Sequence, residues 1–279
     1  FNYLFEVPHN KGISTADFWN KGVDWIFDTF FVYIKAFNTW LIVDVLQPMR
    51  ALFLRMPAVA TLVLAVGAGY LIGGIRSAIV IAALTLFIAL SPWWDRALVT
   101  LYMATFGVVV SCLIVFTVGT LSFQNKKSAA FMLGVCDIFQ TFPSFVYLIP
   151  VMMLFGITDT SVLIAVIVYA TIPATRYTIE GLRSVPVGLH EAATMSGVNK
   201  FQRLTKIEFP LAFPHMMLGL NQTIVFALFM VIIGAFIGTE DLGQYILKAL
   251  SDKNGAGIGL TLGICVAFIG LIIDNYIRT

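Results

Sequence analysis

Charged side chains are scarce in this sequence. Aspartate, glutamate, lysine and arginine make up 11% of its 279 residues, whereas 59% are hydrophobic and the mean hydropathy is +0.92. Soluble domains average about 25% charged residues. The deficit therefore excludes an ordinary soluble domain and predicts an all-α polytopic membrane protein.

Residues that could build a disulfide framework or a metal site are also few. The three histidines, His9, His190 and His215, are too far apart to form a metal-ligand motif. The three cysteines, Cys112, Cys136 and Cys265, all lie in apolar segments. Their odd number and apolar surroundings argue against a disulfide framework. Serine–histidine and paired-aspartate arrangements within a span are missing, which argues against an intramembrane enzyme.

The sequence also lacks the phosphate-binding pattern G-x-x-x-x-G-K-[ST]. Neither "GLHEAATMSGVNK" nor "GGIRS" fits it. If the chain takes part in ATP-driven work, the ATP and its magnesium must therefore bind to another polypeptide.

Long apolar runs dominate what is present. A span needs about 20 mostly apolar residues, and seven candidates appear. The first two are short and separated only by "GGIR", which predicts a tight helical hairpin. Pro143 and Pro150 lie in the fourth and are expected to kink it. The candidates are residues 57–73, 77–91, 97–122, 129–155, 160–178, 213–237 and 258–277.

An aromatic segment precedes these spans. Polar residues recur every three or four positions in it (Asp17, Lys21, Asp24 and Asp28) among tryptophans and phenylalanines. This pattern predicts an amphipathic helix in the headgroup region rather than a span, although its second half could lie deeper. We expect residues 1–55 to form an external arm and residues 56–279 to form the membrane domain.

The loops indicate an orientation. Outside the N-terminal arm, lysine and arginine are more frequent in the loops on the side of residues 179–212 than in those on the other side. Cytoplasmic loops carry the excess of such residues, so we expect segment 179–212 in the cytoplasm. On the opposite side, "GTEDLGQYILKALSDKNGAG" is expected to be an external gate and a contact for a binding protein, or a plain solvated loop.

Segment 179–212 contains a polar run with helical character. Residues 187–196 predict a short helix, Gly197 suits the left-handed position after its end, and "NKFQRLTKIEF" predicts a further turn or two. Pro210 is expected to begin the next membrane helix. Two interpretations of this segment remain: an ordinary loop, or a docking surface for a soluble partner.

The run "EAATMSGVNKFQRLTKIEFP" resembles the EAA motif of ABC-importer permeases, with Phe209 where the motif has leucine. In that family the motif forms a coupling helix seated in a cleft of the cytoplasmic ATPase. The resemblance implies an ATPase-coupling role for Glu191, Ala192, Ala193, Gly197, Ile207 and Pro210.

Most of the chain is similar to the proline/glycine betaine (quaternary-amine) permeases, for instance at "DIFQTFPSFVYLIPVMMLFGI". The resemblance implies a type I importer in the bacterial cytoplasmic (inner) membrane. Two permease copies, usually identical, would act with two ATPases that bind ATP and magnesium and with an external binding protein, but with no nucleic acid. The substrate class would be glycine betaine, choline, carnitine, proline betaine or trimethylamine N-oxide.

Several polar and aromatic residues are candidates for the translocation pathway: Phe142, Phe145, Tyr147, Asn221 and Gln222. Aromatic faces bind quaternary ammonium groups, but rings are so common in this chain that lipid or helix packing is the simpler explanation. The amides of Asn221 and Gln222 line a pathway or, as the simpler explanation, join two helices.

Asp137 is an acid within a predicted span. It could meet a cationic ligand, or pair with Lys126, Lys127 or a neighbouring basic loop. An ATPase-independent secondary transporter or channel using Asp137 for proton coupling is the alternative function. That alternative leaves the spacing of Glu191, Gly197 and Pro210 unexplained.

Overall fold

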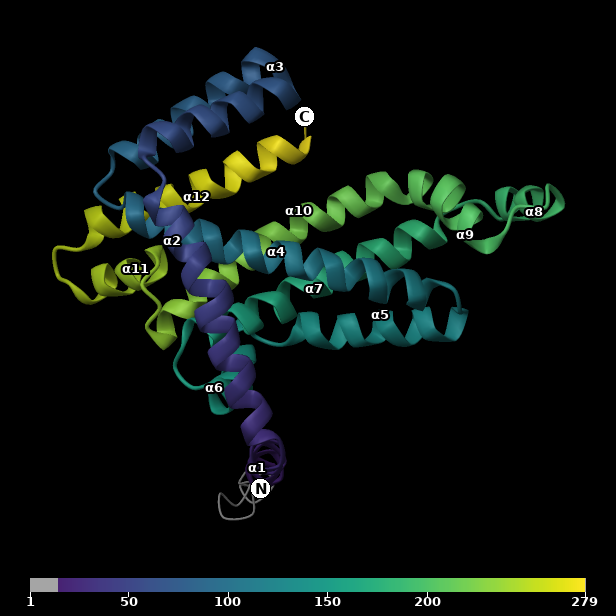
Figure 1. Cartoon of the computed structure of the whole chain (residues 1–279), viewed down its shortest axis with the longest axis horizontal. Coiled ribbons are helices and arrows are strands. Elements are labelled where there is room, and N and C mark those ends of the chain that lie inside the picture. Colours follow the sequence, from purple (N-terminus) through teal and green to yellow (C-terminus); the bar gives the residue numbers. More distant parts are fainter. Residues whose placement is uncertain (1–14, 279) are drawn as a thin grey trace, which may run out of the picture.

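The computed structural model describes residues 15–278, so His9 and the start of the predicted arm lie outside the described part of the chain. Every regular element in this range is helical, which confirms the all-α class (Figure 1). The elements are α1 (Ala16–Trp40), the π turn η3 (Leu41–Leu46), α2 (Gln47–Arg55), α3 (Ala58–Leu90), α4 (Trp94–Phe123), α5 (Lys126–Thr141), η4 (Ser144–Tyr147), α6 (Leu148–Phe155), α7 (Asp159–Arg183), α8 (Val187–Met195), α9 (Lys200–Arg203), the π turn η5 (Leu204–Glu208), α10 (Phe209–Gly234), η6 (Ala235–Ile237), α11 (Leu242–Ser251) and α12 (Ala256–Arg278).

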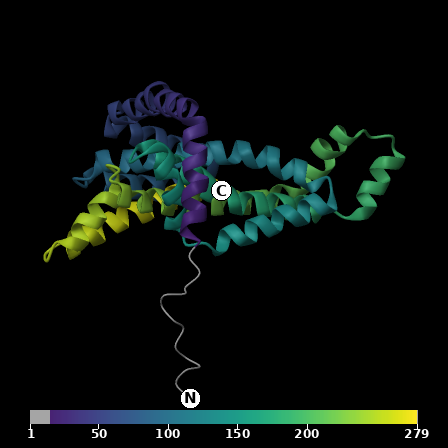
Figure 2. The same ribbon diagram turned by 90° about the horizontal axis from the view of Figure 1, so that it is seen from below.

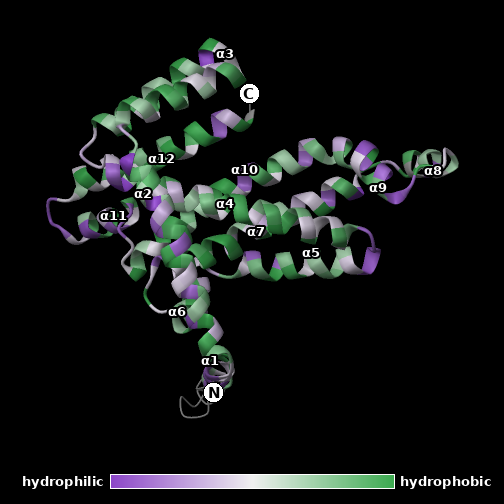
Figure 3. Cartoon of the chain, viewed as in Figure 1, coloured by the Kyte–Doolittle hydropathy of each residue, from purple (hydrophilic) through white to green (hydrophobic). Residues whose placement is uncertain are grey.

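The number of candidate spans is close to the seven expected from the sequence, but the set differs. Helix α3 counts as one candidate where two were predicted (57–73 and 77–91), and the N-terminal run Ala16–Arg55 counts as another. Between residues 15 and 278, six helices or continuous helical runs are long and apolar enough to cross a bilayer, and the bent α5–α6 pair makes a seventh candidate. Predicted spans 97–122, 160–178, 213–237 and 258–277 correspond to α4, α7, α10 and α12. Hydrophilic residues collect at the α4–α5 turn, around α9 and in the loops beside α11 (Figure 3).

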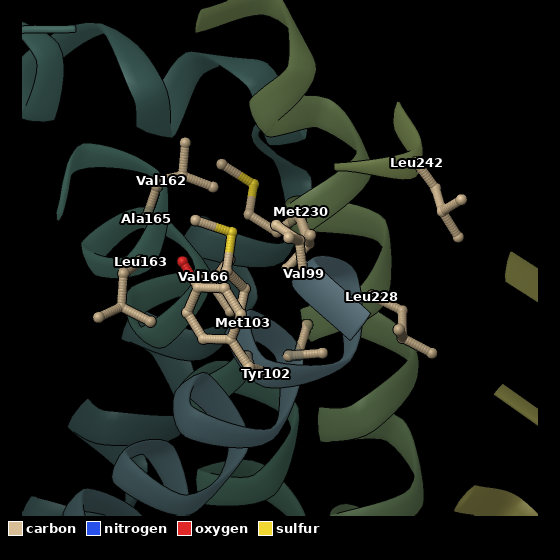
Figure 4. Packing of buried hydrophobic residues seen from close by; sticks show 14 of the residues in the cluster. Val99, Tyr102, Met103, Val162, Leu163, Ala165, Val166, Leu228, Met230 and Leu242 are labelled. Carbon is tan, nitrogen blue, oxygen red and sulfur yellow. The ribbon is translucent and has the colours of Figure 1, made fainter. Parts of the chain in front are cut away.

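Helices α4, α7 and α10 form the core of the bundle. Tyr102 and Met103 of α4 pack with Val162 and Val166 of α7 and with Met230 of α10, all completely buried (Figure 4). In lipid no hydrophobic effect drives helices together, so small residues that allow close approach carry much of the packing.

Two glycines make that close approach possible. A Cβ built at Gly107 of α4 would lie 2.4 Å from Cγ1 of Val166, and one at Gly234 of α10 would lie 2.4 Å from Cγ1 of Val162. Both separations are far below van der Waals contact, so the valines of α7 occupy the space that a side chain would need.

The predicted hairpin at "GGIR" is confirmed. Gly74 adopts φ 67° inside α3, so the helix turns back on itself there. A Cβ at Gly69 would lie 2.5 Å from Cδ1 of Ile81, which places the two arms in contact. The hydroxyl of Tyr276 in α12 donates to the carbonyl of Ala65 at 2.6 Å, and this bond ties the hairpin to the last helix.

The predicted span 129–155 is a broken one. Helices α5 and α6 meet at 108°, because Phe142 is extended (ψ 136°) in front of Pro143 and a residue before proline disfavours the helical conformation. Pro150 lies in the first turn of α6 and breaks nothing. The expected kink therefore occurs at Pro143 alone, and it ends the helix.

Pro210 lies in the first turn of α10, as predicted, but α10 is not a separate helix. The helical run is continuous from Lys200 to Ile237, and the π turn η5 ends two residues before Pro210. Pro48 repeats this arrangement after η3. A proline lacks an N–H donor and clashes with the carbonyl four residues earlier, and the wider π turn accommodates both defects without a break.

The N-terminal aromatic segment forms one continuous helical run from Ala16 to Arg55. Its start exposes large aromatic side chains, including Trp19 and Trp25, while α1 contacts α6 and α2 contacts α4. This run is itself long and apolar enough to span a membrane. Its placement in the interface, and the division of the chain at residue 55, remain predictions.

Candidate functional site

Residues 187–208, the tip segment, stand away from the helix bundle (Figures 1 and 2). Within it, Glu191 and Ala192 are exposed and Ala193 is buried. Large apolar side chains are exposed along it: Val187, Leu189, Met195 and Phe201, with Met195 91% exposed. Because such side chains are costly in water, the tip segment presents a surface suited to a protein partner.

Gly197 shapes the end of α8 as the sequence predicted. It adopts φ 73°, and the N–H of Val198 donates to the carbonyl of Ala193 at 3.1 Å. This bond spans a left-handed residue and satisfies a carbonyl that the helix end leaves open, which is the Schellman arrangement. The chain can therefore reverse sharply between α8 and α9.

The return half of the tip segment is fixed by a reciprocal cap and an ion pair. The Asn199 side chain accepts from the N–H of Gln202, and the Gln202 side chain accepts from the N–H of Asn199. Nε of Arg203 donates to Oε1 of Glu208 at 2.9 Å, and Glu208 is 1% exposed. These contacts hold α9 and η5 in one orientation.

A hollow of about 680 Å³ separates the tip segment from the α4–α5 turn. Lys126, Arg183, Lys200 and Arg203 line it together with Glu208. The α4–α5 turn and the tip segment thus lie at the same end of the molecule. This agrees with the predicted orientation, which places both on one side of the membrane. Of the remaining motif residues, Ile207 is half-buried and Pro210 is exposed.

Two of the pathway candidates belong to a chain of aromatic rings. The centroids of Phe142 and Phe139 lie 6.3 Å apart, and those of Phe139 and Tyr147 lie 6.0 Å apart. The chain continues from Tyr147 to Tyr169 at 5.4 Å and from Tyr169 to Phe226 at 4.8 Å. We call these five residues the aromatic chain; Phe145 is exposed close by in η4.

Asp137 is paired, and its partner lies in α7 rather than in the α4–α5 turn. Nη1 of Arg176 lies 2.5 Å from Oδ1 of Asp137 and 3.4 Å from Oε1 of Gln140, while Nε donates to Glu180 at 3.0 Å. The prediction that Asp137 pairs with a basic residue is thus confirmed. The base is Arg176, and not Lys126 or Lys127.

The two amides of α10 have different surroundings. Nδ2 of Asn221 donates to Oδ1 of Asp274 in α12, which supports a helix-joining role. Gln222 is exposed. The structure therefore does not bring Asn221 to the aromatic chain, and the pathway role of both amides remains a prediction.

An ion-pair cluster at the opposite end was missed by sequence reasoning. Nη2 of Arg50 donates to Glu240 at 2.7 Å, Nη1 of Arg96 donates to the same carboxylate at 3.1 Å, and Nη1 of Arg50 lies 3.8 Å from Asp159. We call these four residues the outer cluster. Two arginines hold the pKa of Glu240 below its usual range.

Asp241 lies beside the outer cluster and is completely buried. Its Oδ1 accepts from the N–H of Gln244 at 3.0 Å and caps α11. Burial raises the pKa of its carboxyl to about 7. Asp241 is thus a titratable group at this end of the bundle with a pKa close to neutral pH.

Arg176 and Tyr169 are two further residues that the sequence analysis did not identify as site residues. Arg176 and Glu180 form an i,i+4 pair, a spacing that could have identified the base. No sequence pattern distinguishes Tyr169, because the chain contains 24 phenylalanines and 9 tyrosines and a single ring cannot be selected among them.

Comparison with known proteins gives a consistent result. A family described as "Binding-protein-dependent transport system inner membrane component" matches residues 113–278. The chain is 88% identical over 278 residues to the trimethylamine N-oxide transport system permease protein TmoV of Pelagibacter ubique, covering 100% of the chain and 39% of that protein. It is 44% identical over 240 residues to TmoV of Ruegeria pomeroyi, covering 86% and 36%.

A more distant relative covers nearly the whole chain. The glycine betaine/proline betaine transport system permease protein ProW of Escherichia coli is 30% identical over 277 residues, covering 99% of the chain and 77% of ProW. Among solved structures, the inward-facing MetNI methionine ABC transporter matches with a TM-score of 0.56 and 20% identity, covering 66% of the chain and 94% of the matched one. That match shows the fold alone. The chain spans about two fifths of the length of the two TmoV proteins.

Proposed function

The chain belongs to the binding-protein-dependent transport system inner membrane components, and on that premise we propose that it is the membrane-spanning part of an ATP-driven importer of small methylated amines. As a member of that family with six or seven candidate spans between residues 15 and 278, it is a multi-pass inner membrane permease and a non-catalytic transport component.

One observation carries the coupling role. The tip segment holds α8 away from the bundle on the Gly197 turn and exposes four large apolar side chains there. The chain also lacks a phosphate-binding loop. We therefore infer that a separate cytoplasmic ATPase, which binds ATP and magnesium, docks on the tip segment. The predicted coupling residues Glu191, Ala192, Ala193, Gly197, Ile207 and Pro210 belong to this surface or stand at its join with the bundle.

The names of the relatives support the substrate class. Two relatives are named for trimethylamine N-oxide and a third for glycine betaine and proline betaine. The relative that is 88% identical is named for trimethylamine N-oxide, so we propose this compound as the first candidate substrate. Glycine betaine, proline betaine, carnitine and choline are further candidates of the same class. High-affinity recognition would belong to an external binding protein.

The mechanism we propose is alternating access. Closure of the ATPase dimer on ATP moves the tip segments of two permease copies, and the helix bundle opens outward to receive substrate. Hydrolysis then returns the bundle to its inward state. Because the α9–η5–α10 helix is continuous, movement at the tip segment reaches the core directly.

Reconstitution tests the proposal. The full-length permease, its ATPase and its binding protein in proteoliposomes should accumulate trimethylamine N-oxide only with ATP, and binding protein with substrate should stimulate hydrolysis. Pull-down with the permease should retain the ATPase. An ATPase-independent carrier or channel would retain none and would pass substrate without ATP, and that result would reject the importer.

A further inference from the structure

The Asp137–Arg176 pair lies on an open face of the membrane domain, with Arg176 two residues inside the end of the predicted span 160–178. The side chain of Asp137 is 58% exposed and that of Arg176 is 36% exposed. Arg176 precedes the end of α7 at Arg183 by seven residues, which corresponds to about 10 Å along the helix. Charged groups within a span are costly in hydrocarbon and face protein or a water-filled path instead. The pair therefore favours protein or water, rather than lipid, on this face of α5 and α7.

The aromatic chain and the ion pair share one face of α7. Tyr169 and Arg176 are seven residues apart and thus lie on the same face of α7, about 10 Å from one another along its axis. Tyr169 joins Tyr147 and Phe226 to the α5 rings. The ring of Phe226 is stacked on Tyr169 with 19° between the planes. Rings from four elements, α5, η4, α7 and α10, therefore converge about two helical turns from the Arg176 level.

We propose that the aromatic chain and Arg176 form two successive binding stations within the membrane domain for small dipolar methylated amines. At the first station the rings hold the methylated ammonium group, and at the second Arg176 receives the anionic oxygen, whether of an N-oxide or of a carboxylate. This proposal rests on the importer function proposed above and assigns that function a recognition site inside the permease.

The chemistry of the groups fits such a ligand. Aromatic faces attract quaternary ammonium groups through the negative charge of their π-systems. A guanidinium carries five N–H donors, and the bonds to Asp137, Gln140 and Glu180 use Nε and Nη1. Among the described contacts Nη2 is left for an incoming oxygen, and the Asp137 carboxylate attracts the ammonium group.

The spacing also predicts a sequence of contacts. A trimethylated N-oxide is shorter than the distance of about 10 Å between the Tyr169 and Arg176 levels, so it cannot occupy both at full strength. The substrate would meet the rings first and then the ion pair, which lies nearer the tip segment. Because each station binds only one end of the substrate, neither holds it tightly, and the substrate can move on through the permease.

A paired set of variants tests the rings. In proteoliposomes with the complete transporter, Tyr169→Leu should reduce uptake per ATP hydrolysed by about 2- to 30-fold, because it removes one cation–π face. Tyr169→Phe keeps the ring and should rescue most of that loss. Phe131→Leu, an exposed aromatic of α5 outside the aromatic chain, should leave uptake unchanged.

Direct binding separates the roles of ring and guanidinium. Saturation-transfer NMR on the complex in nanodiscs, without binding protein, compares trimethylamine N-oxide with tetramethylammonium, which has no oxygen. Tyr169→Leu should weaken both ligands, whereas Arg176→Gln should weaken only the N-oxide. Since Arg176→Gln leaves Asp137 without its base and could impair folding, the Asp137→Asn/Arg176→Gln double variant serves as a second test and should also weaken the N-oxide more than the cation.

The possible results are distinct. If wild-type protein imports the amine but Tyr169→Leu imports and binds as well as Tyr169→Phe, the first station is wrong and the importer stands. Equal losses of both ligands in the Arg176 variants would overturn the guanidinium's role. If the wild-type transporter imports no methylated amine, the proposed function itself fails.

Discussion

The guanidinium of Arg203 lies 2.9 Å from the carboxylate of Glu208, whose side chain is almost completely buried where the tip segment joins the bundle. Both residues lie in the helical run that leads from α9 into α10. A charge removed from water in this way depends on its partners, so the pair helps to fix the angle at which the tip segment leaves the bundle.

Arg203→Ala should therefore destabilise the protein by about 1–3 kcal/mol, the cost of losing a charged hydrogen bond from a buried carboxylate. The lower part of this range applies if water reaches the group, since Arg203 is 30% exposed. Thermal unfolding in detergent measures the loss. Lys206→Ala, an exposed change in the same π turn, is the control, and equal midpoints for both variants would contradict the role of the pair.

Gly197→Ala should cost about 1–2 kcal/mol, because an L-residue is strained in the left-handed conformation. A Cβ there meets nothing within 4 Å, so the penalty is one of backbone alone. Gly188→Ala, a helical position with equal space around it, should be neutral or slightly stabilising. Comparable losses at both glycines would show that the φ of 73° is not responsible.

Gly197→Asp should leave assembly with the ATPase near normal but uncouple ATP hydrolysis from uptake, since the turn sets the position of α8. Hydrolysis and substrate accumulation are measured in the same proteoliposomes. Transport at the parental rate would show that the turn has no coupling role.

Gly107→Ala should destabilise the bundle by about 1–3 kcal/mol through overpacking against Val166. Adding Val166→Ala should restore part of the loss, because the new methyl group then fills the space that the valine leaves. A double-mutant cycle on unfolding midpoints measures this coupling. Gly134→Ala in α5, where a Cβ would meet nothing within 4 Å, is the matched control, and additive effects of the first two changes would reject direct contact.

Stability should fall with rising pH through Asp241. Burial raises its pKa to about 7, above the unfolded value of about 3.9. The folded state therefore binds the proton more tightly, and this contribution is complete below about pH 4 and is lost as pH rises towards 7. Asp241→Asn should flatten the profile between pH 5 and 8 and be more stable at pH 8, by about 1–4 kcal/mol.

Unfolding midpoints across that pH range provide the measurement for Asp241. Asp252→Asn, which alters an exposed carboxylate in the loop after α11, should keep the parental slope. An unchanged slope in Asp241→Asn would show that Asp241 is ionised in the folded protein throughout this range.

The sequence predicted those features that local chemistry controls. Apolar runs located the main spans, the two glycines of "GGIR" marked the hairpin, and Gly197 marked the end of α8. Each depends on residues within one or two turns of one another. The same local reasoning missed the uninterrupted helix through Pro210, because a π turn can absorb the proline and leaves no residue pattern of its own.

Contacts between helices could not be read in this way. Arg176 lies 39 residues from Asp137, and Arg50 lies 190 residues from Glu240. Such pairs depend on how each helix is rotated about its axis and on which helices become neighbours. The aromatic chain has the same origin, since its rings come from four elements.

The π turn before Pro210 keeps 38 residues, Lys200 to Ile237, in a single helix, about 57 Å long at 1.5 Å per residue. That length exceeds the hydrocarbon thickness of about 30 Å. One end carries Phe201 on the tip segment, and the other ends just before Glu240 of the outer cluster. If an ATPase docks at the first end as proposed, we expect its movement to travel along this helix to the Gly238 turn (φ 90°) and from there to the salt bridges of the outer cluster. Opening at one membrane surface would then be linked to ATP binding at the other.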